Sequence, residues 1–307
     1  MKTIKNILIA TLAFFAVSCQ GNLSFDQADA AIFTASIENP ISKVAMGNPY
    51  IGEDNKTHYP MLWYGFEKIT VFGTDGTNNQ FNGDARDAEQ KPVHMSTVDF
   101  KHQGKTFELV EGETYYAVEP YHTDHTIDKD GKITVKTIAN SQYPDPNNGN
   151  LPCISYNATN KAYGETAMVA LAKTTNNYLS FKPVTALIKF TVGSDNVTRV
   201  VFKDKNNTTI AGSNITFDYT GDYPSLPSIA PANNAIYMRM GDNSAFIKGN
   251  TYYMAVLPTK ITPAIGFNFN GATDTPKYQT GKDEIELKPG MILNLGTITI
   301  EQPAPAQ

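Results

Sequence analysis

The sequence is poor in cysteine, has no excess of positive charge, and lacks the apolar runs that span a membrane. It contains 2 cysteines and 1 tryptophan, and its 25 basic residues stand against 30 acidic ones. Because two cysteines cannot form a disulfide framework, the fold must be stabilised by packing. Without a basic excess or a Lys/Arg cluster, nucleic acid is not an expected partner.

What is present favours a folded chain of substantial size. Of the 307 residues, 41% are hydrophobic and only 18% are charged. This composition supports one large domain or two of medium size, each with its own core, and it excludes extensive disorder.

The N-terminus has the pattern of an export signal. Lys2 and Lys5 precede the apolar segment Ile7 to Val17, which is too short to cross a bilayer. The following "FAVSC" is similar to the lipobox of bacterial lipoproteins, with Ala16 where Leu is usual. This similarity implies cleavage before Cys19 and diacylation of Cys19; the alternative is an ordinary signal peptide with an incidental cysteine. We expect residues 1–18 to be the signal peptide.

Short β-branched and aromatic runs separated by Asn, Gly, Asp and Pro predict an all-β fold. The Thr166 to Thr174 run is ambiguous because its alanines also permit a helical turn. The clearest predicted strands are Lys68 to Thr74, Thr114 to Tyr121, Lys132 to Ala139, Ala186 to Val192, Thr198 to Asp204, Thr251 to Pro258, Ile265 to Gly271 and Met291 to Ile300.

An internal repeat indicates a duplicated β-sandwich. "GETYYAVEP" from Gly112 and "GNTYYMAVLP" from Gly249 match with one extra residue in the second copy. In each, the paired tyrosines should place one ring inward and one outward. We therefore predict an N-terminal β-sandwich at residues 19–178 and a C-terminal one at residues 179–307.

The stretch "AIFTASIENPISKVAMG" reads as an edge strand followed by an exposed basic residue. Phe33, Ala35 and Ile37 share one face, and Thr34 and Ser36 the other. Lys43 follows shortly after, and the residues alone do not explain why a strand suited to a core precedes it.

Motifs with catalytic or metal-binding potential are weak. "DKDG" from Asp128 lacks the EF-hand spacing and is read as a hairpin turn. His122 and His125 would point to opposite faces of a strand, so we interpret both as surface residues. Cys153 has no histidine near it in sequence and is interpreted as a small core residue. No hydrolase, zinc-protease or phosphate-loop motif occurs, so neither an enzyme nor a cofactor is expected.

The single tryptophan lies in an aromatic segment, "HYPMLWYGF". Tyr59, Trp63 and Tyr64 are candidates for contact with a glycan or protein ligand. A core position for Trp63 is the preferred interpretation, because aromatic clusters entering a sandwich usually fill its interior.

The C-terminal strand changes phase at Gly296. Leu293 and Leu295 have one parity, whereas Ile298 and Ile300 have the other. Two interpretations remain open: a β-bulge within one domain, or a strand whose last residues project into a neighbouring molecule.

Taken in order behind a lipoprotein signal, several motifs resemble the fimbrillin family of pilus subunits from anaerobic Gram-negative bacteria. The resemblance covers nearly the whole mature chain and is strongest from Asn150 onward. It is carried by "FTASIEN", "NLPCISYN", "FKPVTALIKFTV", "VTRVVFKDKNNTTIAG", "TYYMAVLPT" and "GMILNLGTI".

The resemblance implies a fold and an assembly route. The fold would be two transthyretin-like β-sandwiches in tandem, on a lipoprotein anchored in the outer membrane. A trypsin-like protease would cut after Lys43 and release the strand with Phe33, Ala35 and Ile37. A donor strand with Ile298 and Ile300 from another pilin subunit would then refill the groove. A lipoprotein that does not polymerise, or a pilus tip adhesin, is the alternative.

Overall fold

Strands make up nearly all the regular secondary structure in the described part of the chain, so the predicted all-β class is confirmed. The computed structural model describes residues 32–38, 45–46, 50–51, 57–58, 61–64, 66–91, 93–104, 107–225, 232–269 and 275–302. Among these residues the one helical element is the 3-10 turn η1 (Pro146–Asn148). The ambiguous segment at Thr166 proves to contain a strand, Ala170–Thr174.

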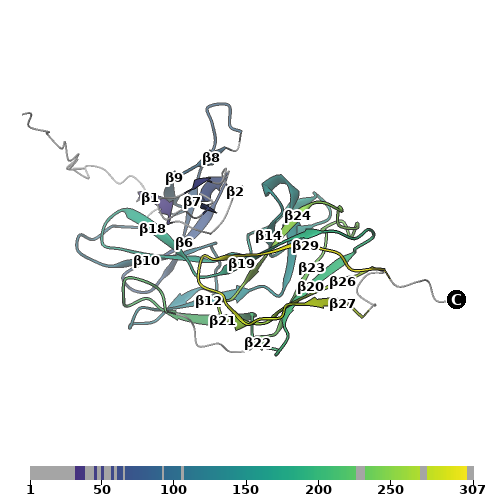
Figure 1. The fold of residues 1–307 in the computed structure, drawn as a ribbon. Helices are drawn as coiled ribbons and strands as arrows, with labels where there is room; N and C mark the ends of the chain where they lie inside the picture. Colours follow the sequence, from purple (N-terminus) through teal and green to yellow (C-terminus); the bar gives the residue numbers. More distant parts are fainter. Residues whose placement is uncertain are drawn as a thin grey trace, which may run out of the picture.

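Strands from the N-terminal half, together with β18 (Tyr178–Pro183), close into a seven-stranded barrel, and the predicted N-terminal sandwich is not confirmed. In Figure 1 the strands of the barrel run from purple to teal and gather on one side of the molecule. In order around the barrel they are β1 (Ile32–Ile37), β18 (Tyr178–Pro183), β17 (Ala170–Thr174), β10 (Tyr115–Glu119), β6 (Lys68–Phe72), β7 (Asn78–Gly83) and β9 (Thr97–His102).

Apolar side chains at alternate positions of the strands fill the barrel interior. In β9, Val98 and Phe100 are buried while Thr97, Asp99 and Lys101 are exposed. Because successive side chains of a strand point to opposite faces, each strand contributes one row to the interior. The buried set includes Phe33, Ala35, Trp63, Ile69, Val71, Phe81, Phe100, Tyr115, Leu179 and Phe181.

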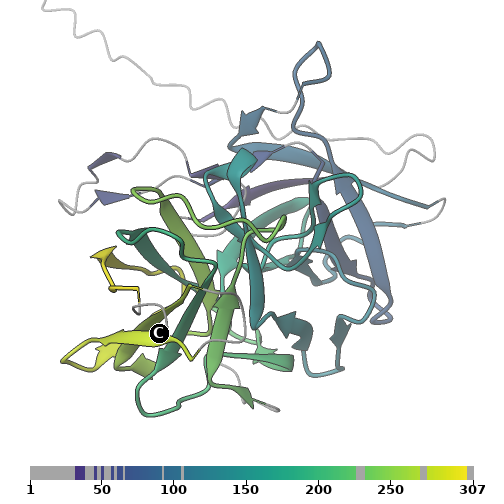
Figure 2. The same cartoon turned by 90° about the vertical axis from the view of Figure 1, so that its right-hand side faces the viewer.

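Two further sheets, built mostly from the C-terminal half, face each other around a second core. Figure 2 shows these green and yellow strands below the blue ones. Phe190, Phe202 and Tyr252 are among the largest side chains buried in this core. One sheet is β24 (Thr251–Val256), β19 (Ala186–Val192) and β29 (Ile292–Ile298); the other is β14 (Leu151–Cys153), β13 (Ser141–Asp145), β23 (Ala235–Met238), β20 (Arg199–Asp204), β26 (Pro263–Asn268) and β27 (Lys277–Thr280).

Strands on either side of residue 178 pair with one another, so the two halves share sheets. β18 itself crosses the predicted boundary and belongs wholly to the barrel. β13 pairs in parallel with β23. A four-stranded sheet also joins the halves: β11 (Thr126–Ile127), β12 (Lys132–Ile138), β21 (Ala211–Asp218) and β22 (Ala232–Asn233). The predicted tandem of separate sandwiches is therefore not what this arrangement shows.

Short strands decorate this framework. Three pair as a small sheet, β2 (Ala45–Met46), β5 (Met61–Tyr64) and β8 (His94–Met95), and the others form hairpins or two-stranded pairs. These are β3 (Tyr50–Ile51) with β4 (Thr57–His58), β15 (Tyr156–Asn157) with β16 (Ala162–Tyr163), and β25 (Lys260–Ile261) with β28 (Ile285–Glu286).

The internal repeat is confirmed as a repeated local structure. In β10 the Tyr115 hydroxyl accepts a hydrogen bond of 2.7 Å from the Val110 amide, and in β24 the Tyr252 hydroxyl accepts one of 3.0 Å from the Ile247 amide. Between the partners lies a glycine in the left-handed region, with φ of 84° at Gly112 and 86° at the matching position. Both copies therefore use a tyrosine to brace the turn that precedes the strand.

The second tyrosine of each pair differs between the copies. Tyr116 is half-buried, as predicted for an outward ring, whereas Tyr253 is buried. Tyr253 packs in a cluster with Leu151 of β14, Leu187 of β19, and Met168, which lies just before β17. The prediction of one inward and one outward ring therefore fails in the second copy because a further layer covers that face.

Candidate functional site

Strand β1 occupies the position that closes the barrel. It pairs antiparallel with β9, placing Phe33 opposite Phe100, and parallel with β18, placing Ala35 opposite Leu179. A strand that follows another in parallel needs a long connection, and here most of the N-terminal half of the chain intervenes. β1 therefore fills a slot between two strands that are far from each other in sequence.

The inward face of β1 is part of the barrel core. Phe33 and Ala35 are fully buried, and Ile37 is partly buried against the same core. The ring of Phe33 lies edge-on to Phe81 and Tyr115, with centroids 5.3 and 5.9 Å away. The sequence predicted this face correctly from its period of two.

The outward face of β1 carries polar contacts to both neighbours. The Thr34 hydroxyl donates to Asp99 at 2.7 Å, and the Tyr178 hydroxyl donates to Ser36 Oγ at 2.7 Å. At the end of the strand, Ser180 Oγ donates to the carboxylate of Glu38 at 2.7 Å. These exposed contacts are worth little individually. The strand is therefore retained mainly by its inward side chains and its backbone pairing.

Trp63 lies in the barrel core and not at a surface. Its ring is fully buried, edge-on to Phe100 and Phe181 with centroids 4.9 and 5.7 Å away. The indole Nε1 donates a hydrogen bond of 2.9 Å to the main-chain carbonyl of Ala35. In this state the indole is not accessible to a ligand, which removes Trp63 from the candidate ligand contacts and makes it a partner of β1.

Three predicted site residues lie outside the described part of the chain. They are the lipidation residue Cys19, the processing residue Lys43 and the candidate ligand contact Tyr59. The last described residue before Lys43 is Glu38.

Ile298 and Ile300 pack against the chain's own C-terminal core. Ile298 is buried, and Ile300, like Leu293 and Leu295, is partly buried against the same cluster. Ser194 Oγ holds the main chain of Ile300 on both sides, accepting from its amide at 2.8 Å and donating to its carbonyl at 2.6 Å. In this structure both side chains therefore belong to the chain's own core, and their projection into a neighbouring molecule, one of the two open interpretations, stays a prediction.

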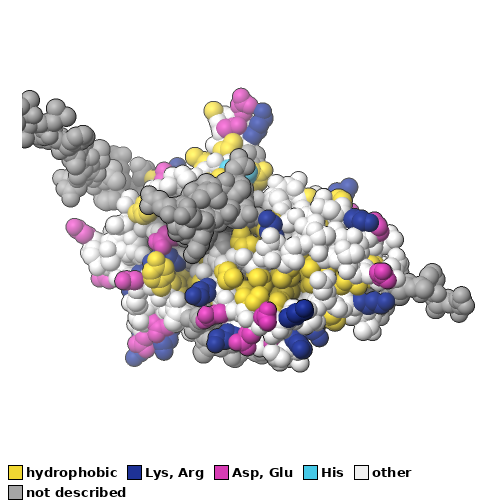
Figure 3. Space-filling model, viewed as in Figure 1, with side chains coloured by type: hydrophobic (Ala, Val, Ile, Leu, Met, Phe, Trp, Pro, Cys, Tyr) yellow, Lys and Arg dark blue, Asp and Glu magenta, His cyan; other side chains and the backbone are white. Residues whose placement is uncertain are grey.

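A β-bulge at Gly296 explains the change of phase in β29. Lys189 and Thr191 of β19 face Asn294 and Thr297 of β29, so β29 holds one extra residue. Gly296 has φ of 69°, in the left-handed region that glycine adopts most readily. The extra residue turns both halves of the strand to the same core. Figure 3 shows a band of hydrophobic side chains at the surface of the molecule, in the region where Figure 1 labels β19, β20 and β29.

Tyr64 lines a cavity of about 310 Å³ beside the barrel. Its ring is tilted against that of His94, with centroids 4.8 Å apart. The opposite wall is formed by the segment from β13 to β16, including Tyr163 and the buried Cys153. The prediction that Cys153 is buried is confirmed. Of the two candidate ligand contacts that the structure describes, Tyr64 lines a cavity and Trp63 is buried in the barrel core.

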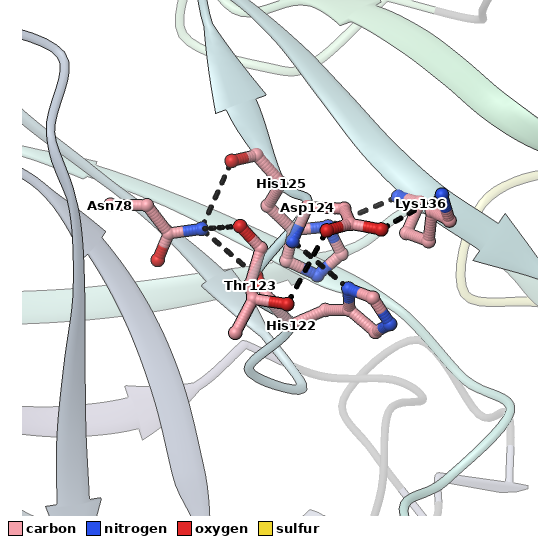
Figure 4. Close-up of polar contacts among 6 residues, drawn as sticks. All are labelled: Asn78, His122, Thr123, Asp124, His125 and Lys136. Carbon is pink, nitrogen blue, oxygen red and sulfur yellow. Dashed lines mark hydrogen bonds and ion pairs between the residues drawn. The ribbon is translucent and has the colours of Figure 1, made fainter.

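The turn that contains His122 and His125 differs from the predicted pair of surface histidines. His125 is buried, and its ring contacts main chain on both sides: Nδ1 accepts from the Lys136 amide at 3.0 Å, and Nε2 lies 3.0 Å from the Pro120 carbonyl. Figure 4 shows Asn78 from β7 reaching into this turn, where its amide donates to the carbonyls of His122 and His125 at 2.9 Å each. The turn is therefore internally braced.

Burial sets the charge of His125. It lowers the pKa of the imidazole to about 4, although the hydrogen bond to the Pro120 carbonyl opposes this change. The ring is neutral near pH 7, so Nε2 carries the proton and donates to Pro120. The alternation of faces along a strand could not predict the burial of His125, because these residues form a turn instead of a strand.

The "DKDG" segment is confirmed as a hairpin turn between β11 and β12. Asp128 accepts hydrogen bonds of 2.9 Å from the amides of Asp130 and Lys132, and Gly131 has φ of 77°. In the described part of the chain, no group of three His, Cys, Asp or Glu residues is placed to hold a metal ion. Within the same residues, no helix has the length and apolarity to span a membrane.

Comparison with known proteins yields structural similarity only. No family model matches the sequence, and no curated protein does. A candidate cell adhesion protein from Bacteroides ovatus is 14% identical, with a TM-score of 0.46 over 88% of this chain and 93% of the other. One from Bacteroides thetaiotaomicron is also 14% identical, with a TM-score of 0.38 over 91% and 100%. The tip fimbrial protein Mfa3 from Porphyromonas gingivalis is 9% identical, with a TM-score of 0.28 over 71% and 80%.

These similar structures are described as cell adhesion or fimbrial proteins. Because every identity is 14% or lower and every TM-score is below 0.5, they do not assign a function to this chain. The geometry of β1 and of the cavity beside Tyr64 has to be interpreted for itself.

Proposed function

We propose that the protein is a structural subunit of a cell-surface pilus that assembles by exchange of strand β1. In this proposal the chain is exported as a lipoprotein, acylated at Cys19 and carried to the outer membrane. A trypsin-like protease cuts after Lys43, and a strand of another subunit takes the place of β1. The product supports adhesion, and the subunit itself catalyses no reaction.

The observation that carries this proposal is the position of β1 in the barrel. It is a short strand of 6 residues that enters between β9 and β18 and precedes the proposed cleavage residue closely. β1 comes before the other six barrel strands in sequence, so its loss would leave the order of those strands intact. A segment of this kind can be removed without unravelling the remaining sheet.

Loss of β1 would create an acceptor for another strand. It would leave β9 and β18 with unpaired edges, which readily pair with an added strand. It would also uncover the core around Phe33 and Ala35, and the burial of one large apolar side chain such as Phe33 is worth roughly 1.5–3 kcal/mol. An incoming strand with alternating apolar residues would restore both the hydrogen bonds and the burial.

The proposed donor is the C-terminal strand, residues 297–301, and it has to leave its own sheet first. In this structure Gly193 donates to the Ile298 carbonyl at 2.8 Å, and Ile298 is buried. Donation would therefore exchange one buried site for another of similar character. Head-to-tail donation does not close on itself and would produce a filament.

A Lys43→Gln variant expressed at the cell surface tests the proposal. We expect the variant to remain unprocessed and monomeric, because a trypsin-like protease requires a basic residue. Lys91→Gln is the matched control, since the Lys91 side chain is 71% exposed and forms an ion pair with the exposed Glu89. Normal filament formation by the Lys43→Gln protein would contradict the proposal.

A second candidate is a tip adhesin or a surface lipoprotein that does not polymerise. The observation that favours it is the packing of Ile298 and Ile300 at home, where they are not available as a donor. A subunit at the pilus tip would still release β1, whereas a surface lipoprotein that does not polymerise would keep it. The two candidates differ in whether Ile298→Asp abolishes filament growth without changing processing at Lys43.

A further inference from the structure

We propose that the cavity beside Tyr64 binds a neutral sugar unit of a glycan. It lies between the end of β5, the start of β6 and the segment from η1 to β16. Its volume of about 310 Å³ is at the lower end of the range typical of small-molecule sites, which suits one or two sugar rings. The inference does not depend on strand exchange and applies to a stalk subunit and to a tip subunit alike.

Aromatic rings from two separate segments line the cavity. Tyr64 and Phe66 come from the barrel side, and Tyr163 comes from the β15–β16 hairpin. Sugars present patches of polarised C–H groups that pack on the electron-rich face of an aromatic ring. Rings on two walls can therefore grip a sugar that has no charge.

Phe66 is held in position although it is largely exposed. Its side chain is 65% exposed, which is unusual for a ring of this size. The guanidinium of Arg86 lies 4.0 Å from the ring centroid, and Arg86 is itself paired with Asp84 through two hydrogen bonds. This support reduces the freedom that the ring would lose on binding.

The polar groups of the cavity are acceptors suited to hydroxyl groups. Glu67, Asp145 and Glu165 line it, against one lysine, Lys68. Carboxylates accept hydrogen bonds from sugar hydroxyls, and an excess of negative charge disfavours sugars that carry a carboxylate or sulfate. Among the residues that the structure describes, no three His, Cys, Asp or Glu side chains are grouped so that they could hold a metal ion.

Two further groups add directional contacts. Burial and the neighbouring Tyr156 and Asp145 raise the pKa of the Tyr163 hydroxyl, which keeps it protonated and able to donate. Asn148 also lines the cavity, and its side-chain amide can both donate and accept hydrogen bonds.

Calorimetric titration of the full chain tests the proposal, with lactose and chitobiose as neutral probes and 3'-sialyllactose as the acidic counterpart of lactose. We expect saturable binding of a neutral disaccharide with a dissociation constant below about 10 mM. The dissociation constant of 3'-sialyllactose should be at least about tenfold higher than that of lactose. Absence of binding for both neutral sugars up to about 10 mM would overturn the proposal, as would preferred binding of 3'-sialyllactose.

Three variants locate the site. Phe66→Ala should weaken binding about tenfold, and Tyr163→Phe, which removes only the hydroxyl, should weaken it several-fold. Tyr223→Ala is the matched control, because Tyr223 is 68% exposed and does not line the cavity. Phe66 is too exposed for its loss to unfold the chain, and circular dichroism checks this.

Unchanged binding in both the Phe66 and Tyr163 variants would place the sugar elsewhere and overturn the proposal. Processing at Lys43 in the Phe66→Ala protein is a separate readout. If it proceeds normally while sugar binding is lost, the cavity and the strand-exchange site are independent.

Discussion

The indole of Trp63 holds strand β1 by its main chain: Nε1 donates a hydrogen bond of 2.9 Å to the carbonyl oxygen of Ala35. The side chain of Ala35 is buried in the same core. One residue of β5 therefore contacts the strand that we propose is released, both through packing and through a directional bond. Any strand that replaces β1 would need to present a carbonyl at this point, because otherwise the buried indole N–H would lose its partner.

Trp63→Phe should loosen β1 more than the rest of the barrel. The substitution keeps an aromatic ring but removes one donor to the Ala35 carbonyl, which stays in the ladder with β9, so the expected cost is that of one lost hydrogen bond, about 0.5–1.5 kcal/mol. Hydrogen exchange should show β1 amides opening about three- to tenfold faster relative to those of β7. Phe181→Leu is the control, since it weakens the same aromatic cluster without touching the Ala35 carbonyl. Equal acceleration of β1 and β7 in the Trp63→Phe protein would show that the hydrogen bond does not hold the strand.

Tyr115→Phe and Tyr252→Phe should destabilise the chain by similar amounts. Each removes a hydroxyl that accepts a bond from the amide five residues earlier, and each loss should lower the free energy of unfolding by about 1 kcal/mol. Denaturant titration measures the effect, with the exposed Tyr223→Phe as a control. A large loss for one variant and none for the other would show that the two turns are not equivalent.

The stability of the fold should fall in mild acid because of His125. Its pKa is lowered to about 4 in the folded chain, against about 6.5 when unfolded. The unfolded chain thus binds the extra proton first, so the free energy of unfolding falls as the pH decreases from about 6.5 to about 4, by up to about 3 kcal/mol, and levels off below that. His125→Gln should flatten this part of the pH profile, while His122→Gln should leave it in place. A profile that is the same in the His125→Gln protein would assign the acid sensitivity to other groups.

Gly296→Ala should cost about 1 kcal/mol through backbone strain alone. The φ of 69° disfavours a side chain, yet a Cβ at this position would meet no atom within 4 Å. Gly221→Ala is a suitable control, because that glycine has no positive φ and its nearest atom lies 4.0 Å away. If thermal unfolding of the two variants gives the same midpoint, the bulge does not depend on glycine.

The strands were predictable where local pattern and burial agree. β19 occupies the predicted residues, Ala186–Val192, and the ends of β6, β10, β12, β20, β24, β26 and β29 differ from prediction by a few residues at most. Alternation also identified the buried face of β1. Such patterns are local, so one chain is enough to reveal them.

The arrangement of sheets and the cavity were not predictable in the same way. Closure of the barrel by β1 depends on pairing with β18, which lies far along the chain, and no local pattern specifies that partner. Parity at Gly296 was ambiguous because a bulge and a second surface give the same sequence pattern. Phe66 and Tyr163 were missed as cavity residues because they are brought together only by the fold. An aromatic residue in a polar segment, as at Tyr163, was the one available signal.

The most direct test of strand release is N-terminal sequencing and intact-mass measurement of the protein taken from assembled surface filaments. Release of β1 after cleavage at Lys43 predicts a chain that begins at Val44 and lacks Phe33, Ala35 and Ile37. A filament subunit that begins at acylated Cys19, with β1 still present, would contradict the account.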